Sequence, residues 1–431
     1  MHGSCPSSLS SHSGSESDLS SGRSSIGSLF RDYGEAYISS YRPCKREIDL
    51  IRSVRLCRTP ALGGHRLTCM ECGYEWYRYF SCGHSHCPIC QGGKRQSWHD
   101  RLESKLLQLP YCHITFTVPH ELNGICRVHP RELYNILFRS AWQSIAELSR
   151  GSDRIGGLPG MTAVLHSWGS DLKQHVHVHC LVTYGGLDEK LSQWKWPICK
   201  HKLFRHRALR NRYRKIFLGR LKCWMKGEHS SCIYHQSYEV LTADLIAKTW
   251  VVNQQPPTAD AKVINAYLSR YICRIGISDS RLQYDAKTQS VRLEYKDYRK
   301  QKPNEAAPVA YRDLSPLLAM RSILQHLLPA NFHRSRHYGL HAYPTYKRVE
   351  QSLPGQVRRH PATIRILFML LKRLLLKPLT KVCDHCGSIT RPQKVLVSPD
   401  PDYKYTFWRA PARSPPERES VAAEGGLIKA I

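Results

Sequence analysis

The chain has 431 residues, 41% of them hydrophobic, which is enough for two or three domains with buried cores. Its formal net charge is +30, from 64 Lys and Arg against 34 Asp and Glu, so we expect a polyanionic partner, most simply nucleic acid. No run approaches the roughly 18 apolar residues that span a bilayer, and the N-terminus lacks the apolar segment of a signal peptide. These features favour a cytoplasmic, DNA-associated protein and exclude the membrane and secreted classes.

The first quarter of the chain divides into a polar start and a cysteine-bearing unit. Residues 1–29 are rich in serine and glycine, which predicts a disordered tail. Residues 30–56 are predicted as helix, and residues 57–92 carry a dense set of cysteines and histidines. A basic connecting helix is expected over 93–107.

The cysteine spacing predicts zinc. Two Cys-x-x-Cys pairs, Cys69 with Cys72 and Cys87 with Cys90, stand fourteen residues apart, and such turns supply two ligands each with matched geometry. In a cytosolic protein the 17 cysteines favour metal over disulfides. Further candidates that could complete a second site or replace one of these four are Cys57, Cys82, His84 and His86. The expected role is structural, with DNA contact by this domain as a secondary hypothesis.

Another Cys-x-x-Cys pair, Cys383 with Cys386, has no cysteine or histidine after it. It is therefore half a site, which either borrows partners from elsewhere in the chain or another subunit, or binds nothing.

The middle of the chain predicts an antiparallel sheet with helices on one face. Residues 111–122 are predicted as a buried strand that ends at Pro119, and 131–149 show a helical period. Residues 162–169 and the histidine-bearing segment 174–182 follow as two further strands. The fold class expected from this order is α+β.

The segment QHVHVHCLV places His175, His177 and His179 at alternate positions. Alternate side chains of a strand share one face, so the intervening residues face a core and the three imidazoles converge on the other side. Neutral imidazole is a common metal ligand, so this face predicts a divalent metal site. The plainer alternative is a half-buried strand with incidental histidines, since the chain holds 23 of them.

Residues 201–222 carry nine Lys and Arg and no acid, with Phe204, Ile216, Phe217 and Leu221 available for a packed stripe. We expect one or two basic amphipathic helices that contact phosphates, although a solvated helix face is the alternative.

Residues 261–275 are predicted as a helix that bears Tyr267 and Tyr271 on one face and Arg270 and Arg274 on an adjacent stripe. A tyrosine can attack phosphorus, and arginines beside it would hold the phosphate. By itself such a tyrosine pair is more often core packing. Together with the histidine strand it fits one chemistry: a metal polarises a phosphate, and a tyrosine attacks it to leave a 5′-phosphotyrosine and a free 3′-hydroxyl.

The sequence resembles the rolling-circle transposases of the insertion-sequence 91 type, within the HUH (His-hydrophobe-His) single-strand endonuclease superfamily. The matching stretches, in order from about residue 30 to about residue 342, are CRTPALGGH, SCGHSHCPICQ, HITFTVPHEL, HSWGSDLKQHVHVHCLVTYGG, YLSRYICRIGISDSRL and HLLPANFHRSRHYG.

The resemblance implies a bacterial protein with a structural Zn²⁺ domain followed by an HUH endonuclease domain, whose antiparallel sheet binds Mg²⁺ or Mn²⁺ and acts on single-stranded DNA at transposon ends. His177 and His179 would be the HUH pair, with His166, His175 and Asp171 as candidates for a third ligand. Tyr267 and Tyr271 would be the nucleophiles, and Arg270, Arg274 and Arg281 DNA contacts. The expected domains are the 1–29 tail, a zinc-binding domain over 30–107, a catalytic domain over 108–345, and a C-terminal helical and partly disordered region over 346–431. The apolar segment 364–376 in this last region is predicted as a buried amphipathic helix.

Two other functions remain open from the sequence. A rolling-circle replication initiator shares the nuclease site. A non-catalytic zinc-dependent regulator would need only the cysteines and the basic surface.

Overall fold

The computed structural model describes residues 26–90, 98, 101–103, 105–151, 155–226, 238–258, 276–302, 305–359, 381–390 and 392–400. Several predictions lie outside these residues: most of the tail 1–29, most of the connecting helix 93–107, the tyrosine helix 261–275 with Tyr267, Arg270, Tyr271 and Arg274, the apolar segment 364–376, and the end of the chain, 401–431. For residues 26–29 the prediction of a disordered tail is wrong, because they form the start of a helix in which Ile26 and Leu29 are buried.

The described elements alternate between helices and short strands. The α-helices are α1 (Ile26–Tyr41), α2 (Lys45–Leu56), α4 (Asn123–Val128), α5 (Pro130–Arg150), α6 (His206–Met225), α7 (Tyr238–Ala247), α9 (Pro316–Leu324) and α10 (Tyr343–Val349). Single 3₁₀ turns are η1 (Pro60–Leu62), η2 (His120–Leu122), η3 (Asp279–Arg281), η4 (Tyr298–Lys300), η5 (Glu350–Ser352) and η6 (Gly355–Val357).

The strands are β1 (Gly64–Thr68), β2 (Glu75–Tyr79), β3 (Tyr111–Thr117), β4 (Gly160–Trp168), β5 (Gln174–Thr183), β6 (Gly186–Asp188), β7 (Gln193–Lys195), β8 (Val252–Gln254), β9 (Leu282–Asp285), β10 (Ser290–Lys296), β11 (Val309–Leu314), β12 (Ser335–Gly339), β13 (Lys381–Val382), β14 (Ile389–Thr390) and β15 (Gln393–Val397).

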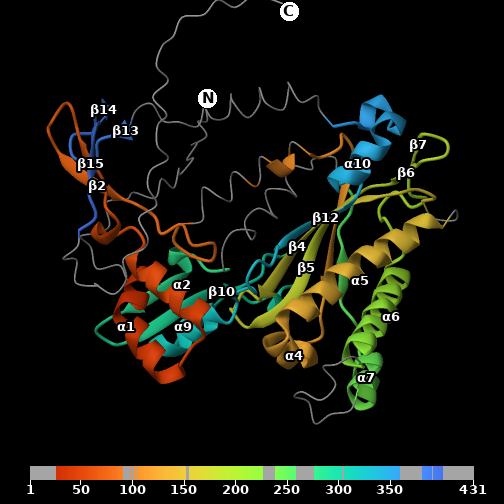
Figure 1. The fold of residues 1–431 in the computed structure, drawn as a ribbon, viewed down its shortest axis with the longest axis horizontal. Coiled ribbons are helices and arrows are strands. Elements are labelled where there is room, and N and C mark those ends of the chain that lie inside the picture. The colour runs from red at the N-terminus through yellow and green to blue at the C-terminus, as the bar shows by residue number, and fades with distance from the viewer. Residues whose placement is uncertain are drawn as a thin grey trace, which may run out of the picture.

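A five-stranded antiparallel sheet lies at the centre of the part of the molecule that contains α5 and α6. Its strand order is β12-β4-β5-β3-β8 (Figure 1). The predicted histidine strand is β5, at the middle of this sheet. Its register places His177 opposite His166 of β4 on one side and Thr117 of β3 on the other. The prediction of a mixed α+β fold with antiparallel strands is therefore confirmed.

Helices α5 and α6 cover one face of this sheet (Figure 1). As the alternation predicts, Val176, Val178, Cys180 and Val182 of β5 point into the core beneath these helices. On α6, Leu209, Tyr213, Phe217 and Leu221 recur every four residues and are all buried, which is the stripe that a surface helix packs on a core.

The predicted helix over 30–56 is instead two helices. Pro43 cannot donate a backbone hydrogen bond, and Arg42 has a left-handed φ of 44°, so the chain turns between α1 and α2. The backbone amide of Cys44 then donates to the Glu47 carboxylate at 2.9 Å, which fixes the start of α2.

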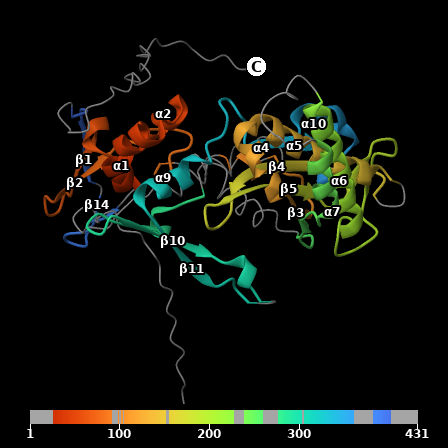
Figure 2. The same ribbon diagram turned by 90° about the horizontal axis from the view of Figure 1, so that it is seen from below.

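The two N-terminal helices pack against elements from much later in the chain. Residues of α1 and α2 share a hydrophobic core with β9, β10 and α9, and Figure 2 shows α9 beside α1 and α2. This core also contains Leu172, from the turn that joins β4 to β5. The N-terminal region is thus packed directly against the turn that leads into the histidine strand.

A small sheet in the order β15-β1-β2 stands beside these helices, with the blue β15 next to the orange β2 hairpin in Figure 1. Among the residues that the structure describes, no helix is both long enough and apolar enough to cross a membrane.

Candidate functional site

Three histidines from two neighbouring strands converge on one point of the central sheet. His177 and His179 come from β5 and His166 from β4, and one ring nitrogen of each lies within 4.8 Å of the others. The Nε2 atoms of His177 and His179 are 3.0 Å apart. All three side chains are buried, on the sheet face opposite to α5 and α6.

In this histidine triad (His166, His177 and His179), the outer nitrogens of His177 and His179 are held by neighbouring groups. The Nδ1 atom of His177 lies 2.9 Å from the backbone carbonyl of His175, so it donates there and leaves Nε2 as the lone-pair nitrogen. The Nδ1 atom of His179 lies 2.8 Å from Nε2 of His113 and 3.2 Å from the Thr115 hydroxyl, both on β3. Such contacts orient imidazoles toward a metal.

Burial keeps the triad neutral. It lowers the pKa of His177 to about 3 and the pKa values of His166 and His179 well below the usual 6.5, and the neighbouring histidines add to the effect. Neutral imidazoles present lone pairs at pH 7, which is the state that binds metal. Three imidazole nitrogens suit a transition ion such as Mn²⁺ better than Mg²⁺, which prefers oxygen ligands. The donor set therefore fits a divalent cation whose other ligands are oxygens.

The other two candidates for a third ligand lie outside the triad. The His175 ring centre is 4.8 Å from that of His177, but the side chain is exposed, and the residue contributes its carbonyl to His177. The Asp171 carboxylate turns to the backbone amide and ammonium group of Lys173. His166, which the sequence left as one option among three, is the residue that the β4–β5 register brings opposite His177.

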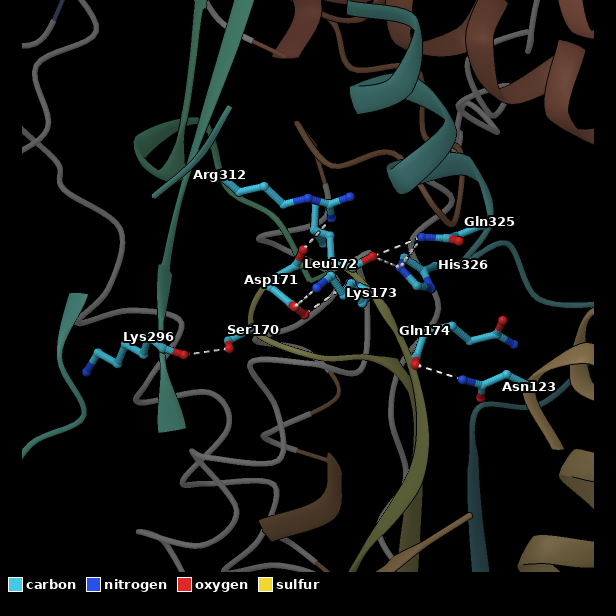
Figure 3. Close-up of polar contacts among 10 residues, drawn as sticks. All are labelled: Asn123, Ser170, Asp171, Leu172, Lys173, Gln174, Lys296, Arg312, Gln325 and His326. Carbon is cyan, nitrogen blue, oxygen red and sulfur yellow. Dashed lines mark hydrogen bonds and ion pairs between the residues drawn. The ribbon is translucent and has the colours of Figure 1, made fainter. Parts of the chain in front are cut away.

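The turn before the histidine strand is held by hydrogen bonds to β10, to β11 and to the residues that follow α9 (Figure 3). The Ser170 hydroxyl donates to the Lys296 carbonyl at 2.7 Å, and Arg312 donates to the Asp171 carbonyl at 3.1 Å. The carbonyl of Leu172 lies 2.9 Å from Nε2 of Gln325 and 3.0 Å from Nε2 of His326. Leu172 itself is fully buried and has a left-handed φ of 57°. These contacts fix the turn that leads into β5.

Arg281, predicted as a DNA contact, has a different set of partners. Its guanidinium donates to the backbone carbonyls of Glu294 and Gly276, each at 3.0 Å, and to that of Ser170. These bonds brace the β4–β5 turn against β10. They use the nitrogens that a phosphate would need, so the structure gives this side chain a bracing position.

Gly276, the first described residue after the predicted tyrosine helix, lies close to the triad. Gly276, five residues after Tyr271, packs on the indole of Trp168 at the end of β4, where any side chain would collide with the ring. Trp168 in turn stacks on His166, with ring centres 5.3 Å apart.

A first group of four cysteines lies at the end of α2. Its sulfur atoms, from Cys57, Cys82, Cys87 and Cys90, all lie within 4.8 Å of one another, and those of Cys82 and Cys90 are 3.7 Å apart. Tetrahedral zinc with Zn–S bonds of about 2.3 Å separates its sulfurs by about 3.8 Å. This inner cysteine cluster therefore fits zinc. The side chain of His86 turns elsewhere, to the Ser85 hydroxyl and the backbone amide of Leu328.

The two predicted Cys-x-x-Cys pairs do not meet. Cys69 and Cys72 lie at the turn of the β1–β2 hairpin, whose strands of five residues are about 17 Å long, whereas Cys87 and Cys90 lie beside α2. The hairpin length keeps the pairs apart. Cys69 and Cys72 lie instead against Cys383 and Cys386.

The predicted basic helix is α6, which begins at His206 rather than near 201. Arg207, Arg212, Lys215 and Lys222 are exposed on it, while its apolar stripe packs on the core. Since α6 packs on the face of the sheet opposite to the triad, its exposed cations lie away from the histidines.

Comparison with known proteins gives a consistent result over most of the chain. Residues 29–118 match the family described as "Transposase zinc-binding domain", and residues 160–349 match the family described as "Putative transposase". The chain is 32% identical over 323 residues to the protein "Putative transposase y4qJ" of Sinorhizobium fredii. The matched region covers 73% of this chain and 79% of that protein. The chain is 26% identical over 360 residues to the transposase for insertion sequence element IS801 of Pseudomonas savastanoi pv. phaseolicola, with 79% and 82% covered. No solved structure matches the chain.

Proposed function

Because this chain belongs to the IS91 family of transposases and carries their N-terminal zinc-binding domain, we propose that it cuts and rejoins single-stranded DNA at transposon ends through a 5′-phosphotyrosine. The histidine triad is the observation that carries this proposal. Three neutral imidazoles on adjacent strands, with two of their outer nitrogens held, form a preorganised metal site of the kind that HUH endonucleases need. A divalent cation bound there would polarise the scissile phosphate and stabilise the charge that develops on it.

Tyr267 and Tyr271 are the proposed nucleophiles. The hydroxyl oxygen of one tyrosine forms a bond to phosphorus while the bond from phosphorus to the 3′-oxygen breaks. The tyrosine proton passes to that oxygen, which leaves as a 3′-hydroxyl, and the 5′-phosphate stays on the protein. The reverse attack by a 3′-hydroxyl rejoins the strand without ATP. The anchoring of Gly276 on Trp168 supports this assignment, because it fixes the chain beside His166 only five residues after Tyr271.

The remaining parts receive supporting roles in this proposal. The central antiparallel sheet with its helices would be the HUH domain, within the predicted catalytic range 108–345. The range 30–107 would hold structural zinc in the inner cysteine cluster, and 346–431 would be an accessory region. Arg270 and Arg274 would contact DNA beside the tyrosines. The exposed cations of α6 would bind phosphates on the far side of the sheet.

A covalent-adduct assay tests the function. The purified chain is incubated with Mn²⁺ and single-stranded oligonucleotides that include candidate transposon ends and are labelled at the 3′ end, and then run on a denaturing gel. We expect a labelled band at protein mass, with the modified peptide containing Tyr267 or Tyr271.

The matched variants are the double change Tyr267→Phe with Tyr271→Phe, and Tyr298→Phe as a control at an exposed tyrosine outside the site. The double variant should lose the adduct and keep its DNA binding, whereas the control should form the adduct normally. An adduct that survives the double change would exclude these nucleophiles. Binding without any adduct would favour the non-catalytic regulator.

A further inference from the structure

The second group of cysteines joins segments more than 300 residues apart in the sequence. Sγ of Cys69 lies 3.9 Å from that of Cys386, and Sγ of Cys72 lies 3.8 Å from that of Cys383. All four sulfurs lie within 4.8 Å of one another. A disulfide would bring two sulfurs to about 2.05 Å, whereas tetrahedral zinc spaces them by about 3.8 Å. The spacing of this outer cysteine cluster is that of zinc ligands.

The two turns that supply these sulfurs are built alike. Each reads Cys-x-x-Cys-Gly, and the glycine amide donates to the carbonyl of the first cysteine, at 3.0 Å for Gly73 and 2.9 Å for Gly387. Both glycines have a φ of 70°, a conformation that residues with a Cβ rarely adopt. The Ser388 hydroxyl lies 2.9 Å from Sγ of Cys386. Two equivalent knuckle turns that face each other are the usual way in which four thiolates surround one zinc ion.

The strands around the cluster pair over their full length and have little core of their own. β15 pairs with β1 over five residues, from Gly64 opposite Val397 to Thr68 opposite Gln393. Four of the five β15 residues are exposed, and Leu396 keeps 68% of its surface in water. Leu67 is the one buried apolar side chain among the residues of β1, β2 and β15. Three short strands with so little apolar burial are marginal in water, so hydrogen bonds alone leave this sheet poorly supported. A metal ion bound at its end would supply the missing stabilisation.

We propose that Cys69, Cys72, Cys383 and Cys386 bind a second zinc ion, separate from that of the inner cysteine cluster, and that this ion closes residues 381–400 onto the β1–β2 hairpin as one zinc ribbon. The zinc-binding region would then consist of two segments of the chain, with the second lying beyond the catalytic sheet in sequence. This proposal does not depend on the nicking activity, because it is tested by the zinc content of the protein and by the alkylation of its thiols.

Zinc content is the first test. The full chain, purified without chelator, should hold two zinc ions per molecule by elemental analysis. The variant Cys383→Ser with Cys386→Ser should hold one. The control Cys199→Ser with Cys223→Ser changes two exposed cysteines outside both clusters and should keep two. A single zinc in the unmodified chain, or two in the first variant, would overturn the proposal.

Thiol alkylation of the unmodified chain provides a test that requires no variant to fold. Cys72 and Cys386 are exposed, so they would react quickly if they held no metal. In zinc-loaded protein we expect both to be protected while Cys199 and Cys223 are labelled, and to be labelled together after a chelator is added. Labelling of Cys386 as fast as Cys199 would overturn the proposal. So would protection that survives the chelator and yields only to a reductant, because that result indicates disulfides.

Discussion

The Nε2 atom of His113 lies 2.8 Å from the Nδ1 atom of His179, and the two rings stack with an angle of 13° between their planes. Burial lowers the pKa of His113 to about 4, so the ring is neutral at pH 7 and its Nε2 atom can accept a hydrogen bond. For His179 to offer its Nε2 lone pair, Nδ1 must carry the hydrogen and donate it to His113 or Thr115. His113 is therefore a positioning residue for the proposed metal site.

Replacing His113 tests this relationship. His113→Phe keeps the ring and removes the acceptor, and we expect Mn²⁺ affinity to fall by about 10- to 100-fold, as for other outer partners of metal-bound histidines. His113→Gln retains an acceptor and should recover part of the loss. Calorimetric titration with Mn²⁺, without DNA, measures both, and His120→Phe is the control at an exposed histidine. Unchanged affinity in His113→Phe would refute the positioning role.

The third ligand can be assigned by comparing His166 with His175. His166→Asn should abolish measurable Mn²⁺ binding, because this residue completes the triad. His175→Asn should bind Mn²⁺ nearly as well as the unmodified chain, since it contributes its backbone carbonyl to His177 and its side chain is exposed. The measurement is the electron paramagnetic resonance signal of free Mn²⁺ in a titration. The reverse order of affinities would place His175 in the site instead.

The buried histidines predict that the metal-free protein loses stability in mild acid. Burial lowers the pKa of His177 to about 3 and of His326 to about 4, against about 6.5 in the unfolded chain. Between pH 6.5 and 4 the unfolded state binds protons that the folded state excludes, so the free energy of unfolding decreases as the pH falls. Each such histidine contributes up to about 1.4 kcal/mol per pH unit.

Urea unfolding in EDTA at pH 7.5 and 5.5 measures this loss. The variant His326→Gln removes one of these groups and should show a smaller difference between the two pH values. A variant whose loss equals that of the unmodified chain would contradict the assignment to His326.

The burial and left-handed backbone of Leu172 predict that its glycine variant is at least as stable as its alanine variant. Leu172 is buried in the core shared by α1, α2 and α9, so Leu172→Ala should cost about 2–5 kcal/mol of unfolding free energy. Its φ of 57° strains any residue with a Cβ by about 1–2 kcal/mol, and glycine is free of that strain. Leu172→Gly should therefore be at least as stable as Leu172→Ala, by chemical denaturation. A glycine variant that is clearly less stable would exclude strain at this turn.

Arg281 and the basic surface of α6 should respond differently to salt and heat. Lys215→Ala with Lys222→Ala should make binding to single-stranded DNA less salt-dependent, by about 0.7 in the log–log slope for each phosphate contact removed. Arg281→Ala should lower the melting temperature and leave that slope unchanged, because its guanidinium is bonded to three backbone carbonyls. A slope altered only in Arg281→Ala would restore its predicted role as a DNA contact.

Local pattern was sufficient for the strand that carries the histidines and for the helices that cover its sheet. Alternation of histidine and valine predicted β5 and its apolar face, and the apolar period predicted the helices α5 and α6. The family resemblance, which comparison confirms, likewise depends on short motifs in the sequence. Each of these signals lies within a few residues of chain, where backbone geometry ties side-chain direction to position.

The membership of each site depended on pairings between distant segments. His166 joins the triad because β4 lies beside β5 in a particular register, and Cys383 meets Cys72 because β15 pairs with β1. Arg281 becomes a brace because three carbonyls from separate elements surround it. The sequence by itself determined which residue types and local elements were available. Only the tertiary structure decided their partners, because strand register and loop closure depend on the packing of the whole core rather than on any local pattern.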